Sequence, residues 1–248
     1  MRSHSKDGSI NETMIRLALN DHYFKDLSDK WKRHISRMFK EIKDDDLITV
    51  NYYEFSDAKP DLEIIVNKRK VLLSIKSGHS PCMHYEPVYT FYNFLRDLKV
   101  SERIIKIIAF YHYGYSLKKE LRERHLTREE IVKEYPNQIK EVNDYFSNNE
   151  DLMREMIYRT IIRGRLKRDL IDYFYFGNSS RGFLLSVSDI YKLISEDKND
   201  FNESICFKSL TYVAGSRKPE SDRRYITKIH WPILCKLFYD KDFMRRYG

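Results

Sequence analysis

The 248-residue chain has little glycine, proline and cysteine. With 8 Gly and 6 Pro, mostly regular structure with short loops is expected. The three cysteines, Cys82, Cys206 and Cys235, show no CxxC spacing and cannot all pair. We therefore expect neither a disulfide framework nor a cysteine-based zinc site, and this composition favours a reducing cytoplasm.

Long hydrophobic runs are missing as well. No segment approaches the roughly twenty apolar residues of a membrane-spanning helix, so we expect no membrane segment. The opening residues, MRSHSKDG, have no apolar run behind their charges. We therefore expect no signal peptide.

Positive charge, in contrast, is in excess. Lys and Arg number 45 and Asp and Glu 37, which gives a formal net charge of +8. The chain also carries 19 Tyr and 14 Phe. Such a balance suits a polyanionic partner, either nucleic acid or an anionic membrane surface, although a soluble basic protein with an aromatic core would show it too.

The most informative stretch is residues 59–78, KPDLEIIVNKRKVLLSIKSG. Two short apolar runs, Leu62–Val66 and Val71–Ile75, flank the polar segment NKRK. This pattern predicts a β-hairpin with residues 67–70 as its turn.

In the simplest register Val66 pairs with Val71, and four polar side chains then share one face of the hairpin. The expected cross-strand pairs are Asp61 with Lys76 and Glu63 with Ser74. Two carboxylates beside an ammonium suit a divalent cation and an activated water. A structural ion pair between Asp61 and Lys76, worth roughly 0.2–1 kcal/mol, would explain the same residues without catalysis.

The segments around the hairpin predict an α/β protein. Helical spacing of apolar residues predicts helices within 10–43, with a break near 26–29, and over 88–98. Strands are expected over 47–55 and 103–113, and the nearly continuous apolar run of the latter is typical of a strand buried on both faces. Strand, hairpin, helix and strand together imply at least one crossover.

The second half of the chain changes character twice. Residues 117–170 are helical in pattern, strongly charged and poor in glycine, with a capping-box spacing from Thr127 to Glu130. Strands are expected again at 181–187, 204–207, 210–214 and 225–229, with helices at 188–194 and 231–239.

Two polar loops supply further candidate residues. The loop at 77–87 leaves the strand that carries Lys76, so we expect His84 and Glu86 to lie beside the predicted site, unless they are ordinary loop residues. The loop at 215–224 carries four cations, Arg217, Lys218, Arg223 and Arg224. A two-stranded ribbon with such a tip fits the DNA major groove, but exposed hairpin loops are often charged without any partner.

Two helical positions also stand out. Glu12 lies close to the apolar stripe of the first predicted helix, where a first-turn acid is also favoured by the helix dipole. The segment 159–168 carries five cations, Arg159, Arg163, Arg165, Lys167 and Arg168. A phosphate contact and a solvated helix end with cations near its C-terminus explain this segment equally well.

Pro60-Asp61 followed by Ser74-Ile75-Lys76 resembles the active-site signature of the PD-(D/E)xK nuclease superfamily. In that family an Asp opens one strand of a hairpin and an acid-x-Lys triplet closes the next. An acid on a preceding helix often completes the metal site. Asp61 matches the first position, Lys76 the last and Glu12 the helix acid, whereas Ser74 stands where the family has its second acid.

The wider layout resembles type II restriction endonucleases of the HinP kind, and this resemblance implies a fold. We expect an α/β restriction-endonuclease-like core with a central mixed β-sheet flanked by helices and a helical insertion. The implied layout is a single nuclease domain, 1–248. It comprises a catalytic core region at 1–116, a helical insertion at 117–170 and a C-terminal β-rich DNA-recognition region at 171–248.

The resemblance also implies Mg²⁺-dependent hydrolysis of duplex DNA at a short specific sequence. The implied metal ligands are Asp61, Glu12, Glu63 and the backbone carbonyl of Ile75. Lys76 would orient or deprotonate the attacking water, and Ser74 would occupy the second-acid position. The expected partners are double-stranded DNA, a second copy of the chain on that DNA and a cognate DNA methyltransferase. The expected location is the cytoplasm, without membrane contact.

Three other functions remain open at this point. A repair or junction-resolving nuclease would use the same site on a different substrate. A DNA-binding protein that lost catalysis at Ser74 would bind DNA with a steep salt dependence and cut nothing. A helix-rich adaptor would use residues 117–170 to bind proteins and would be indifferent to DNA.

Overall fold

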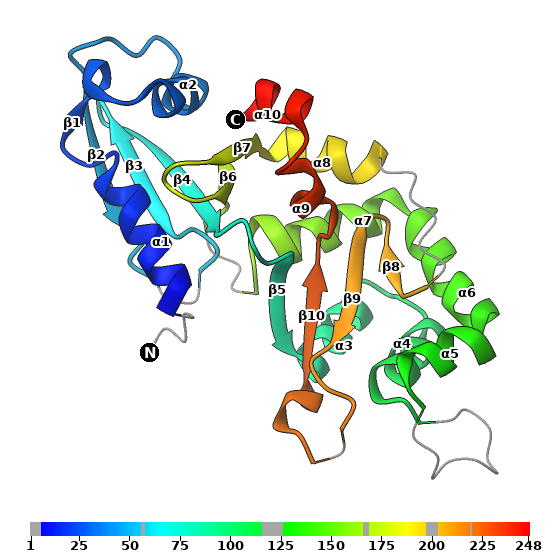
Figure 1. Cartoon of the computed structure of the whole chain (residues 1–248). Coiled ribbons are helices and arrows are strands. Elements are labelled where there is room, and N and C mark those ends of the chain that lie inside the picture. Colours follow the sequence, from blue (N-terminus) through cyan, green and yellow to red (C-terminus); the bar gives the residue numbers. More distant parts are fainter. Residues whose placement is uncertain (1–5, 56–57, 116–125, 166–168, 197–202, 219) are drawn as a thin grey trace. The chain divides into compact units, whose positions relative to one another are not determined.

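The computed structural model of the chain describes residues 6–55, 58–115, 126–165, 169–196, 203–218 and 220–248 (Figure 1). The chain forms two compact units. Unit 1 consists of Met1–Pro81, Ile161–Lys192 and Ile233–Gly248, and unit 2 of Cys82–Thr160 and Leu193–Pro232. In the described ranges, none of the helices combines the length and the apolar character needed to cross a membrane.

Unit 1 contains a six-stranded sheet in the order β1-β2-β3-β4-β6-β7. Its strands are β1 (His22–Tyr23), β2 (Leu47–Tyr52), β3 (Leu62–Val66), β4 (Arg69–Lys76), β6 (Tyr173–Gly177) and β7 (Gly182–Ser186). β4 and β6 are parallel and the other neighbours antiparallel, which confirms the expected mixed sheet. The long connection that a parallel pair requires runs through Cys82–Thr160, a segment of unit 2.

Short helices flank this sheet. They are α1 (Lys6–Leu17), the 3₁₀ turn η1 (Phe24–Asp26), α2 (Asp29–Met38), α9 (Ile233–Leu237) and α10 (Lys241–Tyr247). α1 crosses one face of the sheet (Figure 1). Alternate residues of β3 and β4, such as Ile64 and Leu73, pack against Ile15 of α1 and Ile35 of α2 in one buried cluster. The opposite face of β3 and β4 carries Glu63, Ser74 and Lys76 together with Ile65 and Leu72.

The hairpin of β3 and β4 forms as expected, but the expected register is wrong by two residues. Val66 pairs with Arg69 rather than Val71, and Glu63 pairs with Leu72 rather than Ser74. The turn holds only Asn67 and Lys68, at φ 49° and 65°. Left-handed values at both central positions fit the twist of a hairpin and close it in two residues instead of four.

Unit 2 contains a four-stranded sheet in the order β5-β10-β9-β8. Its strands are β5 (Cys82–Pro87), β8 (Cys206–Phe207), β9 (Leu210–Ala214) and β10 (Ile226–His230). The flanking elements are α3 (Val88–Asp97), α4 (Glu102–Tyr113), α5 (Arg128–Glu134), α6 (Pro136–Ser147), α7 (Glu150–Ile157) and the turn η4 (Asp222–Tyr225). Two elements span the boundaries between the units, the π-helical turn η3 (Tyr158–Ile162) and α8 (Val187–Glu196). Phe91, Phe146 and Phe207 pack in the core of unit 2.

The strand expected at 103–113 is wrong, because this segment is the helix α4. The Ser101 side chain accepts a hydrogen bond from Ile104 N at its start, and Gly114 ends it in the left-handed region at φ 73°. Seven of its residues are buried, so the apolar run reflects a helix surrounded by protein. A continuous apolar run fits a buried strand and a buried helix equally well.

Candidate active site

The Asp61 carboxylate is fixed against the end of β4. Asp61 lies immediately before β3, and its backbone N donates to Leu73 O at 2.8 Å. Its Oδ2 accepts hydrogen bonds from Ile75 N at 2.7 Å and from Ser74 Oγ at 3.2 Å. Ser74 is 1% exposed. Both donors belong to β4, so this strand fixes the orientation of the Asp61 carboxylate.

Lys76 is the last residue of β4 and pairs with Phe176 of β6. Side chains alternate along a strand, so Lys76 lies on the same face as Ser74, the side chain that contacts Asp61. Lys76 is half-buried, as is Asp61. The corrected register therefore places Ser74 rather than Lys76 next to Asp61, with Lys76 one side-chain position farther along the same face.

The first turns of α1 are tied to this end of the sheet. Asn11 Nδ2 donates to Gly177 O at 2.9 Å in a buried contact. Gly177 directly follows Phe176, the partner of Lys76. Glu12, the neighbour of Asn11, is 5% exposed. Asn11 lies inside α1 and anchors this helix to the end of β6.

Two glycines allow the backbone to close up where β4 and β6 end. A Cβ on Gly78 would lie 3.2 Å from Gly177 Cα, and one on Gly177 would lie 2.3 Å from Arg181 O. Both glycines have positive φ, 83° and 144°. The close approach brings the chain after Lys76 against the chain after β6.

Glu63 has other partners. Its carboxylate forms an ion pair with Lys70 of β4 and accepts a hydrogen bond from Asn51 Nδ2 at 3.4 Å. Asn51 and Glu63 are paired residues of β2 and β3. These cross-strand contacts give Glu63 a structural role on the polar face of the sheet.

The donor set allows a direct test of whether a divalent cation fits. Among the described residues, no group of three or more His, Cys, Asp or Glu side chains could hold a metal ion. Mg²⁺, however, is commonly held by one or two carboxylates while keeping waters and substrate phosphates as ligands. The Asp61 carboxylate, beside the Ser74 hydroxyl, meets this lower requirement, and Glu12 of α1 is a buried carboxylate of the same unit.

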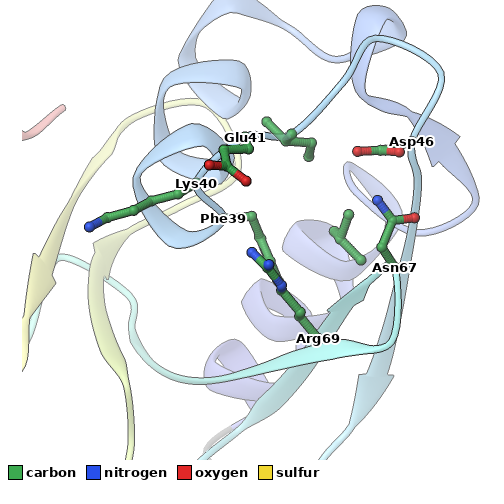
Figure 2. Close-up of a pocket in the computed structure, with 8 residues that line it drawn as sticks. Phe39, Lys40, Glu41, Asp46, Asn67 and Arg69 are labelled. Carbon is green, nitrogen blue, oxygen red and sulfur yellow. The ribbon is translucent and has the colours of Figure 1, made fainter.

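The far end of the hairpin borders a hollow (Figure 2). It measures about 270 Å³ and is lined by Phe39, Lys40, Glu41, Ile42, Asp46, Val66, Asn67 and Arg69. The backbone of Lys43 and the side chain of Asn67 hydrogen-bond the Asp46 carboxylate and lower its pKa. None of the candidate residues lines this hollow, which lies at the opposite end of β4 from Lys76.

His84 and Glu86, expected beside the catalytic residues, belong to a buried network within unit 2. Arg159 Nη2 donates to Glu86 Oε2 at 2.5 Å, and His84 Nε2 lies 3.1 Å from Glu86 Oε1. Burial raises the pKa of the Glu86 carboxyl, but hydrogen bonds from His84 and Arg159 outweigh it and hold this pKa below its usual value. Of the basic segment at 159–168, Arg159 is thus buried, while Lys167 and Arg168 lie outside the described residues.

The loop that joins β9 to β10 is anchored by two of its four candidate cations. Arg217 donates to Tyr111 O from Nε at 3.1 Å and from Nη2 at 2.9 Å. Arg224 Nη2 donates to Tyr115 Oη at 3.0 Å. Lys218 and Arg223 are exposed. Arg217 and Arg224 therefore shape the loop, and Lys218 and Arg223 are presented to solvent.

His112, which the sequence did not single out, completes this anchor. Its Nε2 lies 2.7 Å from Arg224 O and its Nδ1 lies 2.7 Å from Tyr212 Oη. Burial lowers the pKa of His112 to about 4. Because a carbonyl only accepts, the neutral ring donates from Nε2 and accepts the Tyr212 hydroxyl at Nδ1.

No family model and no curated protein matches this chain. A crystal structure of the restriction endonuclease MspI in complex with its cognate DNA is similar to it, with a TM-score of 0.58. The similarity covers 90% of this chain and 88% of that chain, at 12% sequence identity. The fold is therefore the expected restriction-endonuclease-like α/β fold, a mixed sheet with flanking helices.

Proposed function

We propose that the protein is a Mg²⁺-dependent type II restriction endonuclease that hydrolyses phosphodiester bonds of duplex DNA at a short specific sequence. The observation that carries the proposal is the Asp61 carboxylate held by Ser74 Oγ and Ile75 N on the face of β4 that ends in Lys76. This arrangement resembles the PD-(D/E)xK pattern, with Ser74 in place of the second acid, and it lies on a fold similar to that of MspI, whose solved structure contains cognate DNA.

Asp61 and Glu12 are the proposed metal-holding carboxylates, with the Ile75 carbonyl as a further oxygen donor. When bound, Mg²⁺ lowers the pKa of a coordinated water and stabilises the charge of the transition state. Ser74 supplies a hydrogen bond that fixes Asp61 and takes the place of the second acid. Glu63, although a metal-ligand candidate from the sequence, is assigned to its ion pair with Lys70.

Lys76 acts on the attacking water and on the phosphate. Its ammonium donates hydrogen bonds only, so it orients the lone pair of a water and offsets negative charge on a phosphate oxygen. As a neutral amine it would instead take the proton from that water. Its place at the end of β4, beside Ser74, gives a long side chain access to the same polar face as Asp61.

Recognition of DNA is proposed for unit 2. The exposed Lys218 and Arg223 would contact DNA directly, while Arg217 and Arg224 hold the loop in shape. His84 and Glu86 would act behind this surface, since Glu86 pairs with both His84 and Arg159. A second copy of the chain on the DNA, a cognate methyltransferase that protects host sites and a cytoplasmic location are part of the same proposal.

A DNA-binding protein without catalytic activity is the second candidate. The observation that favours it is Ser74 in the position of the second acid, together with the absence of a group of three metal-binding side chains among described residues. Such a protein would bind duplex DNA and leave it intact with Mg²⁺ or Mn²⁺. A repair or junction-resolving nuclease would use the same residues but cut according to DNA structure.

Digestion of a defined plasmid with the full chain and Mg²⁺ separates these functions. Discrete fragments whose sequenced ends share one short sequence support the restriction endonuclease, and EDTA should abolish them. Nicks, or cuts confined to junctions and damaged sites, indicate the repair function. Intact plasmid with either Mg²⁺ or Mn²⁺, despite DNA binding, indicates the non-catalytic protein.

A further inference from the structure

One face of the sheet in unit 2 is exposed at Tyr85 and half-buried at the residues next to it. Tyr85 of β5 pairs with Lys228 of β10, and Lys228 pairs with Val213 of β9. Tyr85 is 60% exposed, while Lys228 and Val213 are half-buried. His230, two residues along β10 from Lys228, lies on the same face and is half-buried.

The other face of the same strands is covered. Tyr212, Thr227 and Ile229 are all buried, and α3 contacts β5 and β10 while α4 contacts β9. In Figure 1, α3 lies behind these strands. The exposure of the Tyr85 face is therefore a property of one side of the sheet, not of a frayed or partly folded sheet.

The charge on the Tyr85 face has one sign. β5, β9 and β10 together contain one carboxylate, Glu86, which is buried and paired with Arg159. Lys228 is the cation of these strands. The proximity of Lys228 also contributes, after burial, to the lowered pKa of His230. An ammonium flanked by a tyrosine ring and an imidazole suits a phosphodiester backbone, where the cation takes the phosphate and the ring packs on a sugar.

The loop that joins β9 to β10 carries further charged residues, which are the exposed cations Lys218 and Arg223 and the exposed acids Glu220 and Asp222. Its exposed cations, Lys218 and Arg223, lie between the ends of the two strands that carry Val213 and Lys228. Arg217 and His112 fasten the loop to α4. These contacts hold the two ends of the loop, so Lys218 and Arg223 lie close to the end of β9 and the start of β10.

We infer that the face of β5, β10 and β9 around Lys228, Tyr85 and His230 is a binding surface for the phosphate backbone of duplex DNA. The inference rests on the proposed function and adds to it a positioning role for residues outside the catalytic residues and the loop. Lys228 binds a phosphate, Tyr85 packs against the adjoining sugar, and the loop cations extend the track.

The test is binding of the full chain to a fluorescent DNA duplex in EDTA over a range of salt concentrations. Lys228→Ala should weaken binding roughly three- to tenfold and reduce the salt slope by about one, because one phosphate contact is lost. Tyr85→Ala should weaken binding without changing the salt slope. Lys228→Arg keeps the positive charge, so its salt slope should equal that of the wild type. Lys106→Ala is the matched control, because Lys106 is exposed on α4, a helix that contacts the covered side of the sheet.

These outcomes distinguish failure of the inference about Lys228 from failure of the proposed function. Wild-type chain that cuts DNA, with Lys228→Ala and Lys228→Glu binding with unchanged affinity and slope, overturns the inference alone. If Lys228→Ala loses no more affinity for DNA than Lys106→Ala does, the inference is overturned as well. Wild-type chain that binds no duplex overturns the inference together with the proposed function. Capture of a protein or of anionic vesicles by this face, with no effect on DNA, would also contradict it.

Discussion

At the scale of single residues, the Asp61 carboxylate depends on its two donors from β4. The Ile75 amide is part of the backbone and cannot be removed by substitution, whereas the Ser74 hydroxyl can. Ser74 is buried, so its hydroxyl is held in place. Substitution of Ser74 therefore tests directly how the orientation of the Asp61 carboxylate is fixed.

We predict that Ser74→Ala slows DNA cleavage about tenfold and raises the Mg²⁺ concentration needed for half-maximal rate, because one hydrogen bond to Asp61 is lost. Cleavage rates over a Mg²⁺ titration measure both effects. Ser36→Ala, at an exposed position of α2, is the control and should leave both unchanged. An unaltered rate and Mg²⁺ requirement in Ser74→Ala would remove Ser74 from the proposed catalytic residues.

His34 offers a prediction about pH. Its ring is fully buried beside Trp31 and Tyr175. Burial, helped by the nearby Lys30, Arg37 and Arg33, lowers the pKa of His34 from 6.5 to about 3. The unfolded chain thus takes up a proton below pH 6.5 that the folded chain refuses until about pH 3. The stability contributed by the neutral ring is present above pH 6.5 and is lost as the pH falls.

We predict that His34→Leu reduces the loss of unfolding free energy between pH 7 and pH 4 by a few kcal/mol. Urea unfolding at both pH values measures the difference. His22→Gln is the control, because His22 is exposed and its replacement should leave the pH dependence as it is. Lys30, whose burial lowers its pKa to about 8, titrates above this range and does not interfere. Identical acid sensitivity of wild type and His34→Leu would refute the argument.

At the scale of elements, the β3–β4 turn shows what sequence periodicity omits. The apolar alternation fixed which side chains share a face, so Asp61, Ser74 and Lys76 were correctly grouped on one face. Periodicity is blind to a shift of two residues, because such a shift leaves every side chain on its face. The register came from the left-handed backbone of Asn67 and Lys68, a conformation that Asn favours but Lys does not.

We predict that Lys68→Gly stabilises the protein by about 1 kcal/mol, because glycine adopts φ 65° without steric cost. Denaturant unfolding measures the change. The same replacement at Lys32, inside α2, should instead destabilise by about 1 kcal/mol. Destabilisation by Lys68→Gly would show that the turn gains more from the lysine than it loses in backbone strain.

The α4 segment shows a second reason why prediction from sequence failed. Its apolar residues, such as Ile105 and Ile108, are buried on several sides, and this erased the helical stripe that periodicity needs. The local signals were nevertheless present, since Ser101 and Gly114 flank the segment as N-cap and C-cap. Weighing the two caps and the length of the run would have identified the helix.

A buried ion pair joins β5 to the π-helical turn η3. The Arg159 guanidinium contacts the Glu86 carboxylate with both side chains almost fully buried, and it also lies over the Phe94 ring at 5.1 Å. We predict that Arg159→Met destabilises the protein by about 3–5 kcal/mol, because Glu86 is left buried without its main counter-charge. Thermal and urea unfolding measure the loss. Arg154→Met, at an exposed position of α7, should change little. Near-wild-type stability of Arg159→Met would mean that His84 alone satisfies Glu86.

At the scale of the whole molecule, each unit of the chain has its own sheet and its own candidate role. The connection between the parallel strands β4 and β6 contains Cys82–Thr160, the first segment of unit 2, and the second segment, Leu193–Pro232, follows after β7. No sequence pattern at Pro81 or Thr160 indicated that the chain leaves unit 1 and later returns to it at these positions. The expected layout of 1–116, 117–170 and 171–248 within one nuclease domain stays a prediction.

The central claim is that Asp61 and Lys76 form the catalytic site of a DNA endonuclease. Its most direct test is cleavage of supercoiled plasmid in Mg²⁺ by wild type, Asp61→Asn and Lys76→Ala, with Glu63→Gln as the control from the same polar face. We expect discrete fragments from wild type and Glu63→Gln. We expect rates at least about a thousandfold lower for Asp61→Asn and Lys76→Ala. Full cleavage by both of these variants would contradict the claim.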